Sequence, residues 1–408
     1  MKKITLIFFL LHGLLSNAQS WLPIQQDTLL EKKHELIFTG TADYASTSLH
    51  KSLTQKLFYG GEITDEIKDK SLKLHRGINQ FGADLNAEIE YRNFQVNLFG
   101  KPTWGFTVKA GYYSFINALY SKDLFKLGFY GNDSFIGSTA SISGTQFAAY
   151  GYQKIGFGWL DKKSKSSISL NVYNLSNYSE ALVRTGEIFQ SQSIDSLSIA
   201  FDGRASFTNG TSFFKGFGAG LDADIRLKVP TKDNKVVYYQ FLAKNIGFTS
   251  LRESMNRYSG DSVFTFTGLT FNQVLNGSSF LDSNFSVLDT LGIQKSQVKT
   301  TVFLPGFLQF SKLVDVNSIR KLQEFYGIRL FLASAYTPLV FAGIDYRIPL
   351  GKINTLNVGL NTSYGGFSKF RIGLYSSLRI KNWSLGLASE NIIGKTGQSI
   401  LFRLQCAY

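Results

Sequence analysis

The chain has 408 residues, with 43 Lys and Arg against 29 Asp and Glu, so its formal net charge is +14. The basic residues are spread singly and form no basic run, which favours an anionic membrane surface over nucleic acid as the setting. The single cysteine, Cys406, excludes an internal disulfide and any cysteine-based zinc site in the monomer. After the N-terminus, no stretch has the roughly eighteen consecutive apolar residues of a membrane-spanning helix.

The first eighteen residues are typical of an export signal. Lys2 and Lys3 give a positive start, an apolar run covers residues 4–15, and the small residues up to Ala18 predict cleavage before Gln19. A membrane anchor is the alternative, but the apolar run is too short to cross about 30 Å of hydrocarbon. We therefore expect a signal peptide at 1–18, a periplasmic segment at 19–33 and a barrel domain at 34–408.

Apolar and polar residues alternate along many segments, as they do when a strand shows one side chain to each face. In the last ten residues, Ile400, Phe402 and Leu404 share one face, whereas Arg403 belongs to the other. The same alternation covers residues 84–91, 221–228, 356–361 and 369–380. A strand with this pattern has one apolar and one polar surface.

A soluble sandwich also alternates, but three features favour a transmembrane antiparallel β-barrel. Small and charged residues share the polar face, aromatic residues mark many strand ends, and the chain ends on an aromatic residue within its last strand. We predict an all-β fold of about fourteen strands, with twelve to sixteen allowed, because single-chain bacterial barrels use even numbers. Both chain ends then lie in the periplasm.

Three long stretches break the alternation and are predicted to be non-strand segments: 46–79, 114–145 and 249–297. The first contains a short charged helix at 63–70. The second places Ile116, Leu119, Tyr120, Leu124 and Leu127 at helical spacing. Each segment is interpreted either as a plug, lid or partner-binding loop or as an ordinary surface loop, since long non-strand segments of compact proteins are often functional.

The parity of the strands predicts a cluster of charged residues inside the barrel. Its members are Arg329, Asp345, Arg347, Lys369, Arg371, Arg379 and Arg403 on the last strands, with Asp84, Glu88 and Glu90 on an early one. Because closure brings the first and last strands together, we expect the early acids to pair with the late bases across the seam or the lumen. Such pairs would make a closed, rigid wall; alternatively, the basic wall attracts an anionic solute.

The residues needed for enzyme chemistry are sparse. After the predicted signal, the chain has three histidines, His34, His50 and His75, and none has metal-ligand spacing. We predict no catalytic site, cofactor or metal. A hydrolase that uses one of the many serines beside one of these histidines is the alternative.

Several short motifs, in their order, resemble a Bacteroidota family of outer-membrane β-barrels of unknown function, which is itself similar to the long-chain fatty-acid transporter type. They are residues 129–132 (FYGN), 152–158 (YQKIGFG), 258–261 (YSGD), 264–268 (FTFTG), 304–305 (LP), 335–338 (AYTP) and 389–394 (SENIIG). The resemblance covers most of 80–408 and implies an outer-membrane barrel, with Phe402, Leu404 and Tyr408 in its C-terminal assembly signal. The start of the chain does not carry the Asn-Pro-Ala motif that such barrels often have, so the resemblance does not extend to the N-terminal hatch of the family.

The function expected from these features is that of a structural or accessory barrel in an envelope complex, such as a secretion or assembly machine. A transporter or channel for a hydrophobic or anionic small molecule is the main alternative. The expected partners are outer-membrane lipid, the barrel assembly machinery and other envelope proteins, without nucleic acid. The expected location is the cell outer membrane.

Overall fold

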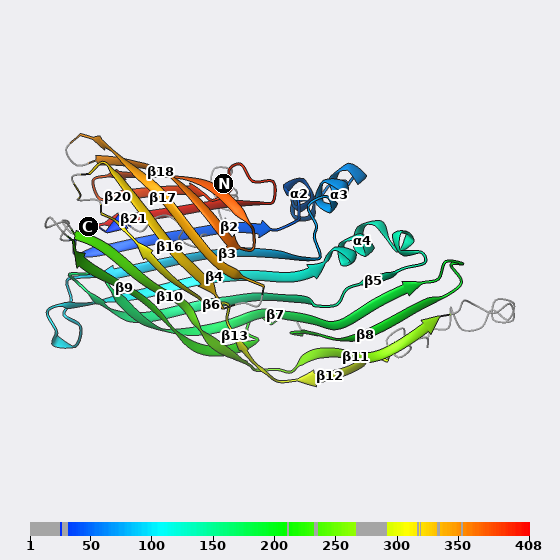
Figure 1. Ribbon diagram of the computed structural model, residues 1–408. Coiled ribbons are helices and arrows are strands. Elements are labelled where there is room, and N and C mark those ends of the chain that lie inside the picture. The colour runs from blue at the N-terminus through cyan, green and yellow to red at the C-terminus, as the bar shows by residue number, and fades with distance from the viewer. Residues whose placement is uncertain are drawn as a thin grey trace, which may run out of the picture.

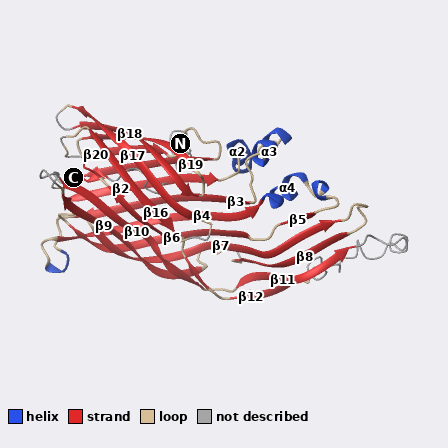
Figure 2. Ribbon diagram, in the orientation of Figure 1, coloured by secondary structure: helices blue, strands red, loops and turns tan. Residues whose placement is uncertain are grey.

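The computed structural model describes residues 25–26 and 32–408, except 210–211, 232–235, 267–291, 316–317, 319, 333–334 and 352–353. The described residues form a closed, antiparallel ring of fourteen strands (Figures 1 and 2). In order around the ring they are β2 (His34–Ser46), β3 (Ile78–Asn93), β4 (Trp104–Ser121), β6 (Thr145–Asp161), β7 (Ser167–Gln190), β9 (Gly216–Pro230), β10 (Val236–Leu251), β14 (Phe307–Lys312), β16 (Leu322–Phe331), β17 (Thr337–Leu350), β18 (Asn354–Gly366), β19 (Phe370–Ile380), β20 (Trp383–Ser389) and β21 (Gly397–Ala407). Pairing of β2 with β21 closes the ring. The predicted all-β barrel and its strand number are confirmed.

The two faces of the strands follow the predicted alternation. On β3, Leu85 and Ile89 are exposed on the outer surface, whereas Asp84 and Glu88 are buried inside the ring. Exposed apolar side chains such as Leu374 and Ile400 continue this outer surface on the last strands. An apolar exterior around a polar interior is the arrangement of an outer-membrane barrel, and the chain is a barrel of that type.

The two ends of the barrel differ. At one end, here called the terminal end, β2 begins beside the end of β21, and the amide of His34 donates to the carbonyl of Tyr408. At the other, the helical end, three short helices cover the connections: α2 (Lys51–Tyr59), α3 (Asp65–Leu72) and α4 (Lys122–Tyr130) (Figure 2). The side chains of His50 and Ser121 accept hydrogen bonds from backbone amides in the first turns of α2 and α4, which fixes where these helices begin.

None of the described helices has the length and hydrophobicity needed to cross a membrane.

One side of the barrel rises beyond the rest at the helical end (Figure 1). Strand β7, with 24 residues, pairs with β9 as far as Leu175 and then with β8 (Leu197–Phe207) from Ser179 onward. The sheet continues from β8 to β11 (Met255–Phe266) and β12 (Gln294–Val298). We call residues 179–190 of β7 together with β8, β11 and β12 the extension.

The remaining elements are short. They are β1 (Gln25–Gln26), β5 (Thr139–Ser141), β13 (Thr301–Phe303), β15 (Val314–Asp315) and the 3-10 turns η1 (Leu98–Gly100) and η2 (Asp133–Phe135). Strand β5 pairs with the outer part of β7, and β13 pairs with β10. Strands β1 and β15 pair with each other in a separate two-stranded sheet.

The predicted non-strand segment 114–145 is wrong at its start, because β4 continues to Ser121. Ile116, Leu119 and Tyr120 therefore lie on a strand, and only Leu124 and Leu127 lie on a helix. Residues 114–121 of β4 pair with β3, and as far as Leu119 they also pair with β6, so hydrogen bonds to both neighbours outweigh the apolar spacing. The helix begins only after the Ser121 cap.

The prediction of a non-strand segment at 249–297 is wrong where the end of β10, the whole of β11 and most of β12 occupy it. Residues 267–291 lie outside the described residues. Strand β11 carries Ser, Asp, Asn and Arg among its residues, so its alternation is weak and could be mistaken for a loop. Segment 46–79 agrees with the structure, since α2 and α3 occupy it between β2 and β3. The predicted signal peptide at 1–18 lies outside the described residues, as does most of 19–33.

Candidate functional site

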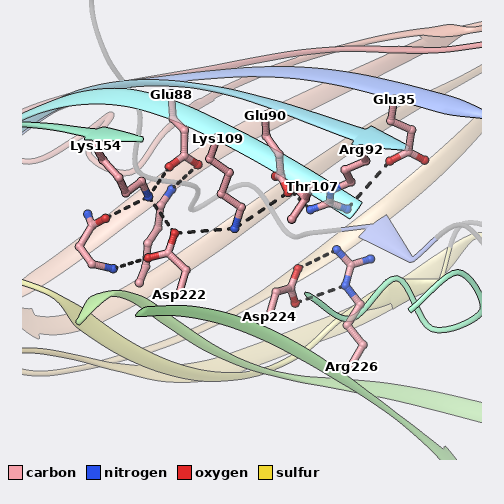
Figure 3. Close-up of polar contacts among 12 residues, drawn as sticks. Glu35, Glu88, Glu90, Arg92, Thr107, Lys109, Lys154, Asp222, Asp224 and Arg226 are labelled. Atoms are coloured by element: carbon pink, nitrogen blue, oxygen red, sulfur yellow. Dashed lines mark hydrogen bonds and ion pairs between the residues drawn. The ribbon is translucent and has the colours of Figure 1, made fainter. Parts of the chain in front are cut away.

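Four charged side chains meet across the lumen (Figure 3). Lys154 on β6 places its Nζ 2.7 Å from Glu88 Oε2 on β3 and 2.8 Å from Asp222 Oδ2 on β9. Lys244 on β10 adds a 2.9 Å contact from its Nζ to Glu88 Oε1. We call these four residues the clasp, because they join β3 and β6 on one part of the ring to β9 and β10 further around it.

The clasp is buried and further held by neutral groups. The Lys154 side chain is 0% exposed, and its Nζ also donates to Asn245 Oδ1 at 3.0 Å. Tyr113 donates from its hydroxyl to Glu88, and its ring lies 5.0 Å from the Lys154 Nζ. Such complete pairing is what a buried charge requires, because removal from water without partners costs several kcal/mol per ion.

Further ion pairs extend the clasp toward the terminal end (Figure 3). Arg92 donates to both oxygens of Glu90, at 2.9 and 3.1 Å, and its Nη1 lies 3.9 Å from Glu35. Lys165, in the connection between β6 and β7, contacts Glu35 Oε1 at 2.7 Å. On β9, Arg226 pairs with Asp224 at 2.9 Å. Bases and acids therefore alternate along this part of the lumen.

Aromatic side chains fill the lumen on the helical side of the clasp. Tyr113 and Tyr152 stack with their ring centroids 5.0 Å apart, and both belong to a buried apolar cluster. Phe115, two residues further along β4, belongs to a second cluster and stacks on Phe331 with a 5.3 Å separation. The lumen therefore contains a charged layer at the clasp and an aromatic layer between the clasp and the helical end.

A separate set of charged residues lies among the last strands. Arg371 Nη1 contacts Asp43 Oδ1 at 3.2 Å, and its Nη2 contacts Glu390 Oε2 at 3.1 Å. Arg329 donates from Nε to Gln309 at 2.8 Å. The contacts of Arg371 tie β19 to β2 and to the β20–β21 connection near the seam, and the contact of Arg329 ties β16 to β14.

Six of the ten predicted lumen charges are buried inside the barrel. They are Asp84, Glu88, Glu90, Arg329, Asp345 and Arg371. Arg347, Arg379 and Arg403 lie on their strands at the same parity but are partly exposed. Lys369 is the exception: it is exposed and precedes β19 in the turn after β18, so its predicted inward direction is wrong. The predicted alternation begins at Lys369, whereas strand β19 begins one residue later, at Phe370.

Within the described part of the chain, none of the three predicted early acids forms a direct ion pair with a predicted late base. Asp84 accepts from Asn86, Glu88 pairs with the clasp lysines and Glu90 pairs with Arg92. Bases on β6 and β10 reach Glu88, whereas the close partners of Glu90 and Asp84 lie on β3 itself. The late base that does form an ion pair close to the seam, Arg371, takes Asp43 instead.

The sequence reasoning missed the most connected residues, Lys154, Asp222 and Lys244. Parity could have found the first two: Lys154 alternates with the outward Ile155, and Asp222 belongs to a segment whose alternation is plain. Lys244 is harder, because an irregularity in the pairing of β10 with β9 follows Ala243 and interrupts the alternation.

The three histidines hold structural positions. His34 contacts the Tyr91 hydroxyl, and His75 contacts the carbonyl of Ser71 at 2.8 Å. His50 Nδ1 lies 2.7 Å from Ser52 Oγ, but it also accepts from the Ser52 amide as the cap of α2. The charged groups that act on His50 are lysines, so the described residues give it no carboxylate to orient it as a base. No group of three potential metal ligands occurs among the described residues.

A hollow of ≈ 330 Å³ lies on the extension. Arg184, Arg204, Asp202 and Asp261 line it, together with the backbone of glycines on β8 and β11. Arg184 contacts Asp202 at 3.1 Å, and Asp202 lies directly opposite Asp261 in the pairing of β8 with β11. Two like charges at opposed positions destabilise a sheet, so this surface is not arranged for stability alone.

No family model matches the chain, and no curated protein matches it. Among solved structures, a FadL homologue from Pseudomonas aeruginosa is 9% identical, with 93% of this chain and 91% of that chain covered and a TM-score of 0.38. The Pseudomonas putida toluene transporter TodX is 11% identical, with 93% and 89% covered and a TM-score of 0.35. The translocator domain of the autotransporter NalP from Neisseria meningitidis is 8% identical, with 93% and 90% covered and a TM-score of 0.32. Likeness at this level transfers no activity, and membership of the Bacteroidota family stays a prediction.

Proposed function

We propose that the chain is a non-conducting outer-membrane barrel that anchors the extension outside the membrane, where a partner of an envelope complex binds. The observation that carries the proposal is the clasp. Its four charged residues come from β3, β6, β9 and β10 and meet within the lumen. A general pore instead keeps a water-filled channel between its charged walls.

The layers on either side of the clasp support a closed lumen. The aromatic clusters fill the helical side, and a cavity of ≈ 70 Å³ lies among the charged residues on the terminal side. Water occupies roughly 30 Å³ per molecule in the liquid, so this cavity holds only a few molecules. Among the residues that the structure describes, these layers favour a membrane anchor over a route for solutes.

The extension is the part of the molecule suited to contact with a partner. It lies beyond the ring, and its hollow has the size of sites that bind small molecules or single side chains. Asp261 forms no ion pair within the described part of the chain, so its carboxylate is available to a group from a partner. We therefore propose that recognition takes place on the extension.

Conductance in planar bilayers tests the closed lumen. The wild-type protein is expected to show no ion-permeable openings, whereas Lys154→Met, Lys244→Met and Glu88→Gln together are expected to produce them, since they remove the charges that hold the clasp. A wild-type protein with steady openings would overturn the proposal.

Photo-crosslinking in native membranes tests the extension. A photoreactive residue at Ser259, in the hollow, is expected to capture a partner protein, while the same residue at Leu374, on the apolar exterior, is expected to give lipid adducts only. Equal protein capture at the two positions would count against a binding site on the extension.

The aromatic layer favours a second candidate, passage of a hydrophobic or anionic small molecule after rearrangement of side chains. The seal consists of side chains on the wall, which can move without unfolding a domain. Transport would require a bound ligand detected by native mass spectrometry, or ion-permeable openings that change with Arg371→Ala plus Arg379→Ala. An empty lumen and unchanged conductance would remove this candidate.

A further inference from the structure

The cavity on the terminal side of the clasp is unusual in its charge. It has a volume of ≈ 70 Å³. Five bases and four acids line it: Arg92, Lys109, Arg226, Lys244 and Arg403, with Glu88, Glu90, Asp222 and Asp224. Its wall therefore has a surplus of one positive charge before any ligand is counted.

The four acids of this wall are already paired. Glu88 contacts both Lys154 and Lys244, and Asp222 contacts both Lys154 and Lys109. Glu90 contacts Arg92, and Asp224 contacts Arg226. The carboxylates are thus committed to other bases, which leaves the fifth base of the wall to be satisfied in another way.

That base is Arg403 on β21. Its guanidinium forms no hydrogen bond or ion pair within the described part of the chain, and its Nε is shielded from solvent. The residues opposite it in the sheet are Thr39 on β2 and Gly386 on β20, neither of which carries charge. An enclosed N–H without a partner is costly, and an ion of opposite sign that enters from the water-accessible side of Arg403 would satisfy it.

We propose that the cavity binds a small monovalent inorganic anion, of the size of chloride, with Arg403 as its principal ligand. One such anion neutralises the surplus charge of the wall. A cavity of ≈ 70 Å³ accommodates a halide with a water molecule and excludes large organic anions. Arg403 remains partly accessible to water, which gives the anion a way in from the terminal side without opening the clasp.

The anion has a structural consequence for the clasp. Lys109 lies 3.7 Å from Asp222 and 4.0 Å from Glu90, so it belongs both to the network around the clasp and to the wall of the anion site. Occupancy of the site offsets repulsion among the bases on this side of the lumen. Binding only to the folded barrel must raise its stability by mass action.

The test is thermal unfolding of the full chain in detergent, in sodium chloride, sodium bromide and sodium gluconate at equal ionic strength. Chloride and bromide are expected to raise the Tm above its value in gluconate, which is too large for the cavity. Arg403→Gln is expected to reduce the apparent chloride affinity about tenfold or more, equal to about 1.4 kcal/mol. Lys369→Gln removes a charge from the exposed turn and is expected to leave the chloride effect unchanged.

Two further measurements keep the test decisive. If Arg403→Gln does not fold, Arg403→Lys keeps the charge and is expected to bind chloride more weakly than wild type. Anomalous diffraction from bromide-soaked crystals is expected to give a peak beside Arg403. Equal Tm values in chloride and gluconate, or a cavity that holds water alone, would overturn the anion site and would leave the non-conducting barrel untouched.

Discussion

The clasp and the extension contain the same kind of ion pair in opposite surroundings. Lys154 and Glu88 approach to 2.7 Å with side chains 0% and 7% exposed, whereas Arg184 and Asp202 approach to 3.1 Å with side chains 62% and 30% exposed. Burial makes both members of the first pair necessary, because water cannot solvate the charge that remains when one member is removed. Exposure makes the second pair exchangeable, because water or a ligand can take the place of either member.

The comparison shows how one barrel can have a closed lumen and also an exposed surface that is available to a ligand or a partner. Inside, charges from several strands are mutually satisfied and fix a single arrangement. On the extension, the opposed Asp202 and Asp261 leave the surface incompletely paired. The following substitutions test this difference, beginning with the largest expected effect.

Removing the central charge of the clasp should destabilise the barrel most. Lys154→Met leaves Asp222 without the close contact from Lys154, and we expect a loss of about 3–5 kcal/mol in the free energy of unfolding. Denaturant unfolding in detergent, followed by the mobility shift of the folded barrel, measures it. Lys154→Met combined with Glu88→Gln, Asp222→Asn and Lys244→Met is the matched control and should recover much of the loss, since none of the four clasp charges then remains unpaired.

Tyr113→Phe should have the next largest effect. The substitution removes the hydroxyl that donates to buried Glu88, and we expect a cost of about 1–3 kcal/mol. Tyr112→Phe, on the outer face of the adjacent position, is the control and should change the unfolding free energy little. Equal effects of the two variants would contradict the assignment of the inner face.

The helices at the helical end should loosen in acid. Burial against Phe125 and Tyr120 lowers the pKa of His75, with a smaller contribution from Lys122, despite the hydrogen bond to Ser71. Because the folded state resists protonation, its stability falls as the pH drops below the ordinary histidine pKa of about 6.5, and the fall continues until the pH reaches the lower pKa of the folded state. Hydrogen exchange in α3 and α4, corrected for the intrinsic exchange rates, should accelerate between neutral pH and pH of about 5.5.

Two variants check the origin of this pH effect. His75→Phe should remove most of it, since the ring contact is kept and the titration is lost. His50→Asn should remove a smaller part, because burial and the neighbouring lysines also lower the pKa of His50, which caps α2 through its ring nitrogen. Exchange that accelerates equally in wild type and His75→Phe would exclude His75 as the source.

The exposed pair should contribute least to stability. Arg184→Met is expected to change the unfolding free energy by less than about 1 kcal/mol, because the side chain is largely solvated. The same variant is expected to reduce crosslinking of a partner from Ser259. A large loss of stability with unchanged crosslinking would reverse the roles assigned to the clasp and the extension.

Much of the fold could be predicted from the sequence, because a barrel wall between lipid and a polar lumen imposes a strict alternation. The last strands show it plainly, and Arg371 and Asp345 were placed correctly by parity alone. The approximate strand number followed from counting alternating segments. Lys369 failed because it lies beyond the end of its strand, where parity has no meaning.

The clasp and the extension could not be predicted in the same way. Parity assigns Glu88 to the lumen but does not say which base it meets, since that depends on the tilt of the strands and on which side chains reach the centre. The contact with Lys244 joins residues 156 positions apart. The sequence of strand β11 resembles a loop, because neither of its faces has the consistent apolar pattern that lipid imposes.

The change of neighbour along β7 separates two properties of the chain that are usually linked in a barrel. Circumference depends on the number of strands in the ring, whereas the height of the wall beyond Ser179 depends only on the hairpins added there. The extension can therefore be lengthened, trimmed or exchanged by insertion and deletion while the membrane-embedded ring and its register stay the same. Evolution and protein engineering can vary recognition on this scaffold without refitting the barrel to the membrane.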